Sequence, residues 1–516
     1  MSRAGPALSA VAIPVSLIAL WQLLSWSLRF GYLPAPVDIL AALPAEVRSG
    51  ALLSAIAHTL GVALTASAVA GGVGTVAGLA FGSAPRVGRW ATASIEAFRT
   101  VPAVTLIPAT VLAFGPTRRA EILLATYAAV WPIVLNTAGA VRSVHPRQFD
   151  IAQTFHLSAY DTLRKIVIPA ATPVWLVGAR LSVILAFLVT VVAEMVITPA
   201  GLGGALAQSL NALAPERMWV YAISCGAVGL VLNLGLRNAV GAILPMHPVA
   251  GPGGTVPRAP APSARGLIPL AVMLVAWQLT ASPSSLVAPP PTQWFAALAD
   301  LHAEASLLPA VGRTLVTYLA GLFAATVLGS AAGAVIGASH RIDRAVSPSL
   351  DFVAAIPGAA LVPVLVLLFG TSVVSGIAAV TLIVTWPILL STATARRAVA
   401  LVRLDVSRTM GLSPWRRWSA VILPSLTPGV LLGVRVSSAL ALIVALLTDI
   451  FGAGTGIGRL LIESQQRFDA ATAWGLLLIV GAFGYLTNSA LARLSGVPYA
   501  SADAANPRTA APSRSR

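Results

Sequence analysis

Charged residues within apolar stretches are the side chains of this sequence best placed to do chemistry. Glu194 and Asp449 lie deepest in such stretches. A charge in lipid is costly, on the order of several kcal/mol, so these residues usually face a bundle interior, a water path or a partner. We expect Glu194 and Asp449 to line a solute path, with gating or structural pairing as the alternative. Charged residues nearer the ends of such stretches are Glu96, Asp351, Arg180 and Arg435.

No constellation for catalysis, metal binding or nucleotide hydrolysis is found. The six histidines show no metal-ligand spacing, and the single cysteine, Cys225, excludes an internal disulfide or a cysteine metal cluster. A Walker A loop needs a lysine after its glycines to reach the phosphates of a nucleotide. Lys165 is the sole lysine and follows no glycine run. We therefore expect no enzyme activity, no cofactor and no metal site.

The composition predicts a membrane protein. Of 516 residues, 57% are hydrophobic and only 10% are charged, with a mean hydropathy of +0.86. A soluble domain carries about 25% charged residues, so lipid must be the solvent for much of this surface. The net charge of +16 does not indicate nucleic acid, because the basic residues lie in loops between apolar segments.

Apolar segments long enough to cross a bilayer occur in two series. The first predicted series is 7–28, 58–82, 90–114, 120–141, 173–197 and 218–244, and the second is 267–281, 312–339, 345–369, 374–395, 428–451 and 473–494. Between them, residues 246–266 are rich in Pro, Gly and Ala, as in a linker. The predicted organisation is a first unit (1–245), a linker (246–266), a second unit (267–499) and a disordered tail (500–516).

The two series are copies of one unit. Trp131 and Trp386 are separated by 255 residues, and Arg180 and Arg435 by the same offset. Further pairs at this offset are Pro102 with Pro357, Phe114 with Phe369, Glu194 with Asp449, and Asn233 with Asn488. Because six crossings is an even number, both copies face the same way and the repeat is parallel. The sequence thus predicts an all-α membrane protein of two parallel six-helix units with about twelve crossings.

The arginines predict the orientation. Most of the 33 Lys and Arg residues fall on one side if both termini are cytoplasmic, as the positive-inside rule requires. Two polar, basic loops of matching spacing then face the cytoplasm. We name them the first polar loop (residues 150–169, DIAQTFHLSAYDTLRKIVIP) and the second polar loop (residues 405–424, DVSRTMGLSPWRRWSAVILP). Two such loops on one side indicate docking of a soluble partner.

The polar loops resemble the EAA loop of ABC importer permeases: an acidic residue, small residues, a glycine and a hydrophobic-Pro ending. Around them, WQLL at Trp21, RTVPAVTLIP at Arg99 and WPIVLNTAGAVRSV at Trp131 resemble the branch of these permeases that moves nitrate, sulfonates and taurine. WPILLSTATARRAV at Trp386 repeats the resemblance in the second unit. It covers most of both units and implies two permease units fused in one chain of the cytoplasmic membrane.

The resemblance also implies partners and site residues. The partners are two ATP-binding cassette ATPase subunits, one on each polar loop, an extracytoplasmic solute-binding protein and a small solute. The ATPase-docking residues it implies are Asp150, Ala152, Thr154, His156, Ser158, Ala159, Tyr160 and Pro169 in the first polar loop, and Asp405, Ser407, Thr409, Gly411, Ser413, Pro414 and Pro424 in the second.

This sequence departs from the family pattern at two points. Asp150 and Asp405 replace the usual glutamate. His156 stands where the pattern has a glycine, which Gly411 retains. A left-handed turn is easy for glycine and strained for histidine, so the first polar loop is expected to hold its partner less well or to use a different turn.

Prolines predict breaks in the third helix of each unit. Pro102 and Pro357 lie within these segments, and broken helices can expose backbone groups to a central cavity. They are therefore assigned to the translocation path, with a packing role as the alternative. Two other functions remain open: an ion-coupled secondary transporter, in which Glu194 or Asp449 carries protons, and a membrane scaffold that transports nothing.

Overall fold

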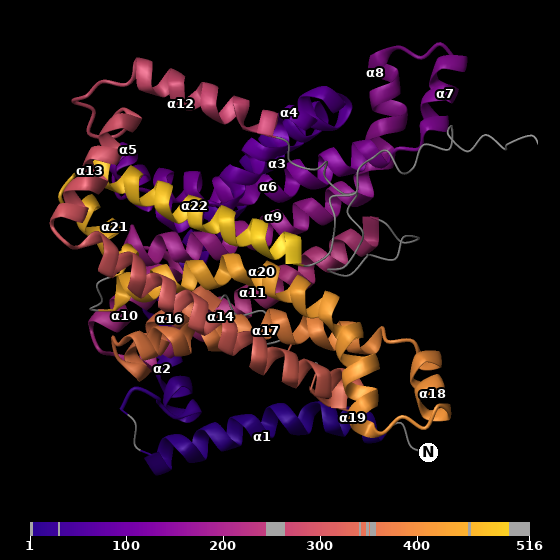
Figure 1. The fold of residues 1–516 in the computed structure, drawn as a ribbon. Coiled ribbons are helices and arrows are strands. Elements are labelled where there is room, and N and C mark those ends of the chain that lie inside the picture. The colour runs from indigo at the N-terminus through magenta and orange to yellow at the C-terminus, as the bar shows by residue number, and fades with distance from the viewer. Residues whose placement is uncertain are drawn as a thin grey trace, which may run out of the picture.

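The structure is a computed structural model that describes residues 4–28, 31–243, 264–339, 342–346, 350, 358–452 and 456–494. These residues form helices and short connections, with no strand among them. Figure 1 shows long helices lying side by side as a bundle, with short helices at its two ends. The predicted all-α fold class is confirmed.

Residues up to 243 form the first unit. Its helices are α1 (Ala4–Leu28), α2 (Pro36–Arg48), α3 (Ala51–Ser83), α4 (Pro85–Thr100), η1 (Ala103–Leu106), α5 (Ile107–Phe114), α6 (Arg118–Ser143), α7 (Pro146–Thr154), α8 (Ala159–Thr162), η2 (Leu163–Val167), α9 (Ile168–Val196), α10 (Gly201–Asn211) and α11 (Pro215–Ile243).

The described residues between 264 and 494 form the helices of the second unit. Its helices are η3 (Ala264–Leu267), α12 (Ile268–Thr280), α13 (Pro291–Ala303), α14 (Leu307–Ala338), η4 (Gly358–Leu361), α16 (Val362–Phe369), α17 (Val373–Arg397), α18 (Leu401–Thr409), α19 (Pro414–Arg417), η5 (Trp418–Ile422), α20 (Leu423–Phe451), α21 (Ile457–Gln466) and α22 (Ala470–Leu494).

The repeat in the sequence is a repeat in the fold. Helix α9 and its counterpart α20 each have 29 residues, and α5 and α16 each have 8. Each pair begins and ends at positions that differ by 255. The two units therefore fold alike, helix by helix.

Eight of the described helices are long and apolar enough to cross a membrane. Residues 93–100 and 103–114 together make a ninth candidate, bent by 79°. The bend lies at Pro102, which disfavours helical geometry at the residue before it; Val101 is extended (φ −71°, ψ 117°). The break predicted at Pro102 is confirmed. Pro357 and Asp351 lie outside the described residues.

Two helices of the second unit are short: α12 covers the predicted segment 267–281, and α16 is the described end of the predicted segment 345–369. Helix α12 has 13 residues, and α16 has 8. Both are too short to cross a bilayer core alone, which takes about 20 helical residues. In α16 the helix begins beside Pro363, after the short η4 turn, because proline favours the first turn of a helix.

Within each unit, a row of glycines lets two helices touch. In α3, Gly74, Gly78 and Gly82 face α6; a Cβ on Gly78 would lie 2.5 Å from the Cβ of Thr137. Small residues four apart allow close backbone approach between membrane helices. The row recurs in α14 as Gly329, Gly333 and Gly337, which face α17.

The units pack on each other reciprocally. Helix α5 of the first unit contacts α21 and α22, and α16 of the second unit contacts α10 and α11. One buried apolar cluster includes Val192 from the first unit and Val444 from the second. A Cβ on Gly484 of α22 would lie 2.8 Å from the carbonyl of Thr100. The units therefore share one core.

Candidate functional site

The polar loops have the same architecture in both units. The first runs from α7 through a turn to α8 and the π-helical turn η2; the second runs from α18 to α19 and η5. Figure 1 shows both pairs of short helices at the same end of the bundle, on the right of the view, and α10 and α21 at the opposite end. A helix, a turn and a second helix are thus present in both loops.

The turn in each loop is closed by matching hydrogen bonds. The Leu157 N–H donates to the Ala152 carbonyl at 2.9 Å, and the Leu412 N–H donates to the Ser407 carbonyl at 3.2 Å. This bond across five residues ends a helix when the residue before its donor is left-handed. His156 and Gly411 are those residues, with φ of 48° and 65°. His156 therefore adopts the same left-handed turn as Gly411, and the first polar loop does not use a different turn. The turn is strained for histidine but not for glycine.

A serine starts the second helix of each loop. The Asp161 N–H donates to Ser158 Oγ at 3.1 Å, and the Arg416 N–H donates to Ser413 Oγ at 3.3 Å. Such capping satisfies a backbone donor at a helix start. In the first loop, the Asp161 carboxylate also accepts from Lys165 Nζ at 2.9 Å. Lys165, with Ser158, holds the pKa of the Asp161 carboxyl below its usual range.

Both loops expose large apolar side chains at equivalent positions. Tyr160 is 67% exposed and its counterpart Trp415 is 75% exposed. Phe155 and Met410 are another such pair, at 73% and 71%. Exposed apolar groups concentrated on a polar segment mark an interaction surface.

The remaining predicted loop residues divide into an exposed and a buried set. Ala152 and Ser407 are buried, and Ser407 Oγ donates to the Leu404 carbonyl at 2.6 Å. These two residues lie on the buried face of the first helix of each loop. The exposed set is Asp150, Thr154, His156, Ser158, Ala159, Pro169, Asp405, Thr409, Gly411, Ser413, Pro414 and Pro424.

Glu194 and Asp449 are buried in matching hydrogen-bond networks. Glu194 is 0% exposed, and its Oε2 accepts from the Thr59 hydroxyl at 2.9 Å and from the Gly203 N–H at 3.0 Å. The Leu202 N–H donates to Thr59 Oγ1 at 2.9 Å. The carboxylate and Thr59 therefore satisfy backbone donors at the start of α10.

The second unit repeats this arrangement. Asp449 is 2% exposed and accepts from the Thr314 hydroxyl at 2.6 Å and from the Gly458 N–H. The Ile457 N–H donates to Thr314 Oγ1 at 2.9 Å, at the start of α21. This geometry favours the structural-pairing alternative for both carboxylates.

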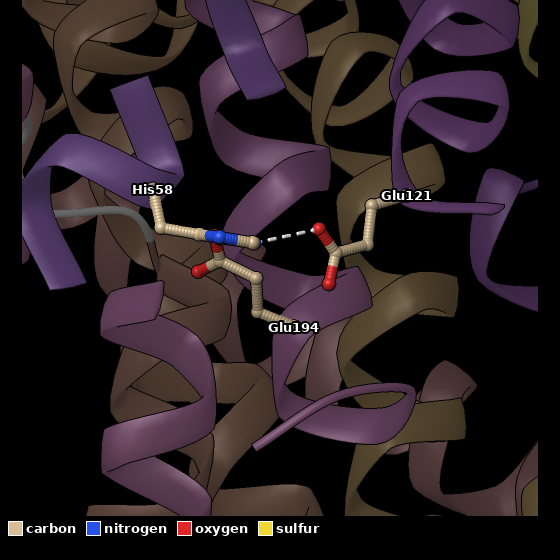
Figure 2. A group of neighbouring side chains, drawn as sticks. All are labelled: His58, Glu121 and Glu194. Carbon is tan, nitrogen blue, oxygen red and sulfur yellow. Dashed lines mark hydrogen bonds and ion pairs between the residues drawn. The ribbon is translucent and has the colours of Figure 1, made fainter. Parts of the chain in front are cut away.

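Around Glu194 the first unit adds two side chains that the sequence did not single out. Figure 2 shows the ring of His58 (α3) pointing toward the carboxylate of Glu121 (α6), with the carboxylate of Glu194 (α9) beside them. His58 Nε2 lies 2.9 Å from Glu121 Oε2, across 63 residues of sequence. No local spacing joins them, so only the packing of three helices reveals the group.

Two further predicted features are explained by the structure. Arg180 Nη2 donates to Asn233 Oδ1 at 2.8 Å, and Arg435 Nε donates to Asn488 Oδ1 at 3.2 Å. Both asparagines therefore make hydrogen bonds between helices, α9 with α11 and α20 with α22. Glu96 pairs with Arg99 within α4, at 2.5 Å.

A helical membrane body of two like units, each presenting the same exposed turn at one end, is the architecture of a transport permease. The chain belongs to the family described as binding-protein-dependent transport system inner membrane component, which it matches at residues 70–245 and again at 325–496. It is a multi-pass inner-membrane permease of an ATP-binding cassette importer, and importers of this family act with an ATPase and a binding protein.

Three relatives illustrate the similarity. A protein named as an aliphatic sulfonates transport permease, SsuC of Bacillus subtilis, is 29% identical over 198 residues, which is 38% of this chain and 72% of SsuC. The nitrate import permease protein NrtB of Synechococcus elongatus is 28% identical over 212 residues (39% and 76%). The formylaminopyrimidine transport permease protein ThiX of Halalkalibacterium halodurans is 27% identical over 228 residues (44% and 91%). Each relative matches less than half of this chain.

Proposed function

We propose that this chain supplies both permease units of its importer, with one ATPase subunit seated on each polar loop. The observation that carries the proposal is the repetition of one backbone turn, closed by the same hydrogen bonds, at one end of both units. Two equivalent turns call for two equivalent partners. The ATPase-docking residues are those that the sequence predicted in the two loops.

The loops are the place where nucleotide-driven motion enters the membrane. Tyr160 and Trp415 offer apolar anchors, which are favoured at the centre of protein interfaces. Each loop continues through a π-helical turn into a spanning helix, α9 or α20. ATP binding draws the two ATPases together, and the loops then move the spanning helices so that the pore opens outward; hydrolysis resets it.

The end that bears the loops is cytoplasmic in this proposal, and both termini lie on the same side. The sequence support is the excess of arginine on that side. The predicted unit boundaries, 1–245 and 267–499 with a linker at 246–266 and a tail at 500–516, complete the organisation. The binding protein then docks at the opposite end, near α10 and α21.

The proposed substrate is a small oxyanion. Two of the relatives described above are named for nitrate and for aliphatic sulfonates. The third is named for a formylaminopyrimidine, a heterocycle that serves as the comparison solute. The deep burial of Glu194 and Asp449 keeps their carboxylates away from an anion, so we assign them to anchoring α10 and α21. Pro102 shapes the path by bending its helix, and Pro357 is its counterpart.

Reconstitution tests the function. The full chain is placed in liposomes with the ATPase and binding protein encoded beside it, and uptake of labelled nitrate, taurine and formylaminopyrimidine is measured. The proposal expects uptake of an oxyanion that requires both ATP and the ATPase. Uptake driven by a pH gradient without the ATPase would instead identify an ion-coupled transporter, and absence of uptake under every condition would identify a scaffold.

Variants test the docking surface. Tyr160→Ala and Trp415→Ala are each expected to weaken ATPase binding at least tenfold and to lower uptake, because each removes an exposed anchor. Phe295→Ala is the matched control, since Phe295 is 60% exposed but lies on α13, away from the loops. Normal ATPase binding by both loop variants would contradict the assignment.

A further inference from the structure

The group of His58, Glu121 and Glu194 has the composition of a metal site. Each residue offers one ligand atom, and these three atoms lie within 4.8 Å of one another (Figure 2). The group joins α3, α6 and α9, three long helices of the first unit. One imidazole with two carboxylates is a donor set that suits divalent zinc or manganese.

The outer oxygens of both carboxylates are held in place. The Thr198 hydroxyl donates to Glu121 Oε1, and the Thr59 hydroxyl donates to Glu194 Oε2 at 2.9 Å. The Gly203 N–H also donates to Glu194 Oε2. Metal-binding carboxylates are commonly oriented by such hydrogen bonds to the oxygen that does not face the ion. In Glu121, the bond from Thr198 occupies Oε1, so Oε2 is the oxygen that faces His58.

One carboxylate oxygen has no partner. Glu194 is fully buried, and its Oε1 lies among the buried polar atoms that make no hydrogen bond. A buried, unsatisfied carboxylate oxygen is costly and needs an explanation, such as a bound ion. This atom is an observation independent of the clustering itself.

The charge of the group supports a cation. Glu121 and Glu194 are both 0% exposed, so two carboxyl groups lie out of water, where both ionise only if a cation lies beside them. His58 supplies at most one positive charge, and a divalent ion balances both.

The second unit has different residues at two of the three equivalent positions. Arg313 stands in place of His58, and Gly376 in place of Glu121. Asp449 there shares the lining of a small cavity with Arg313 and Gly376. One carboxylate there lies near one fixed guanidinium charge, whose Nη2 donates to the Thr371 carbonyl at 3.0 Å, and no second carboxylate is present at the position of Glu121. The first unit instead combines an imidazole with a second carboxylate.

We propose that the first unit binds one divalent transition-metal ion, of the zinc class, through His58, Glu121 and Glu194. Ligand atoms of a tetrahedral zinc ion are roughly 3.4 Å apart, given bond lengths of about 2.1 Å. Side-chain adjustments of about 1 Å bring the three atoms to that spacing. The His58 side chain is 23% exposed, so the group is not fully sealed inside the protein. The ion would clamp α3, α6 and α9, with no counterpart in the second unit.

Metal titration of the purified full chain tests the proposal. The protein in detergent is first stripped with a chelator and then titrated with ZnCl₂, with metal content measured by mass spectrometry and unfolding followed by tryptophan fluorescence. We expect about one Zn²⁺ per chain and a midpoint temperature that rises with zinc concentration, because the ion binds the folded state. Co²⁺ in place of Zn²⁺ should give the visible absorption of a nitrogen- and oxygen-ligated ion.

Matched variants separate this site from adventitious binding. His58→Gln and Glu121→Gln, which keep the side-chain size, should lower zinc affinity at least tenfold and remove the thermal shift. His302→Ala, in α13 of the second unit, should bind zinc as the wild type does. Unchanged affinity in His58→Gln and Glu121→Gln, or less than about 0.2 Zn²⁺ per wild-type chain, would overturn the proposal. Should a glutamine variant fail to fold, the Co²⁺ spectrum of the wild type decides, since a spectrum without a nitrogen ligand also overturns it.

Discussion

His156 and Gly411 occupy the same position in the two polar loops and share a left-handed backbone, with φ of 48° and 65°. The turn is therefore fixed by the fold of the loop, and the histidine adopts it despite its side chain. A left-handed residue other than glycine costs roughly 1–2 kcal/mol.

Exchanging these two residues should have opposite effects. Gly411→His should lower the free energy of unfolding by about 1 kcal/mol, because it adds the strain that His156 already bears. His156→Gly removes that strain, but glycine also raises the conformational entropy of the unfolded chain, which costs roughly 0.5–1 kcal/mol of stability. The free energy of unfolding is therefore expected to rise by less than it falls in Gly411→His. SDS titration of the purified protein measures both. Destabilisation of equal size by both substitutions would show that the turn is not the cause.

The glycine row of α3 predicts a sharp contrast within one helix. Gly78→Ala places a Cβ 2.5 Å from the Cβ of Thr137, and 2.9 Å from the Val134 carbonyl. Overpacking of this kind costs about 1–3 kcal/mol. Gly71→Ala is the control, since a Cβ there has no atom within 4 Å. Thermal unfolding should shift down for Gly78→Ala alone; equal shifts would contradict the close packing of α3 on α6.

The carboxylate networks predict equal roles for two threonines in the two units. Thr59→Val and Thr314→Val keep the shape of the side chain but remove its hydroxyl. That hydroxyl donates to Glu194 or Asp449 and accepts from a backbone N–H at the start of α10 or α21. Leaving buried groups unsatisfied costs about 1–3 kcal/mol in each unit.

Thr65→Val provides the comparison, because Thr65 lies on the exposed face of α3. SDS titration should show a loss for Thr59→Val and Thr314→Val and little change for Thr65→Val. If only one of the two substitutions lowered the stability of the protein, the two hydrogen-bond networks would not be equivalent in energy.

Cysteine labelling can establish which side the loops face. Cys225 is 0% exposed, so the wild type should react little with a membrane-impermeant maleimide. In a Cys225→Ala background, Gln153→Cys and Arg408→Cys should react only from the cytoplasmic side, and bound ATPase should protect them. Gln208→Cys, in α10 at the opposite end, should react from the other side. Labelling of the loop cysteines from outside would reverse the proposed orientation.

Local and periodic signals made much of this fold predictable. The offset of 255 residues, the apolar segments and the polar loops can all be read along the chain, and each recurs in the structure. The break at Pro102 was also predictable, because proline restricts its neighbour. His156 could be placed in a left-handed turn by its alignment with Gly411.

The buried groups were not predictable in the same way. His58, Glu121 and Glu194 meet only because α3, α6 and α9 pack together, and no periodicity encodes that meeting. The same holds for Thr59. Its hydroxyl donates to Glu194, and this contact led us to assign Glu194 to anchoring α10 and not to the solute path.

The shared core of the two units, joined in one polypeptide, has a consequence for assembly. When α5 packs on α21 and α22 while α16 packs on α10 and α11, each unit finds its partner within its own chain, at a high effective concentration. The two halves are thus made in a one-to-one ratio at translation, and pairing with a foreign half is disfavoured. Each polar loop is then free to diverge, as His156 has from Gly411, without altering its twin.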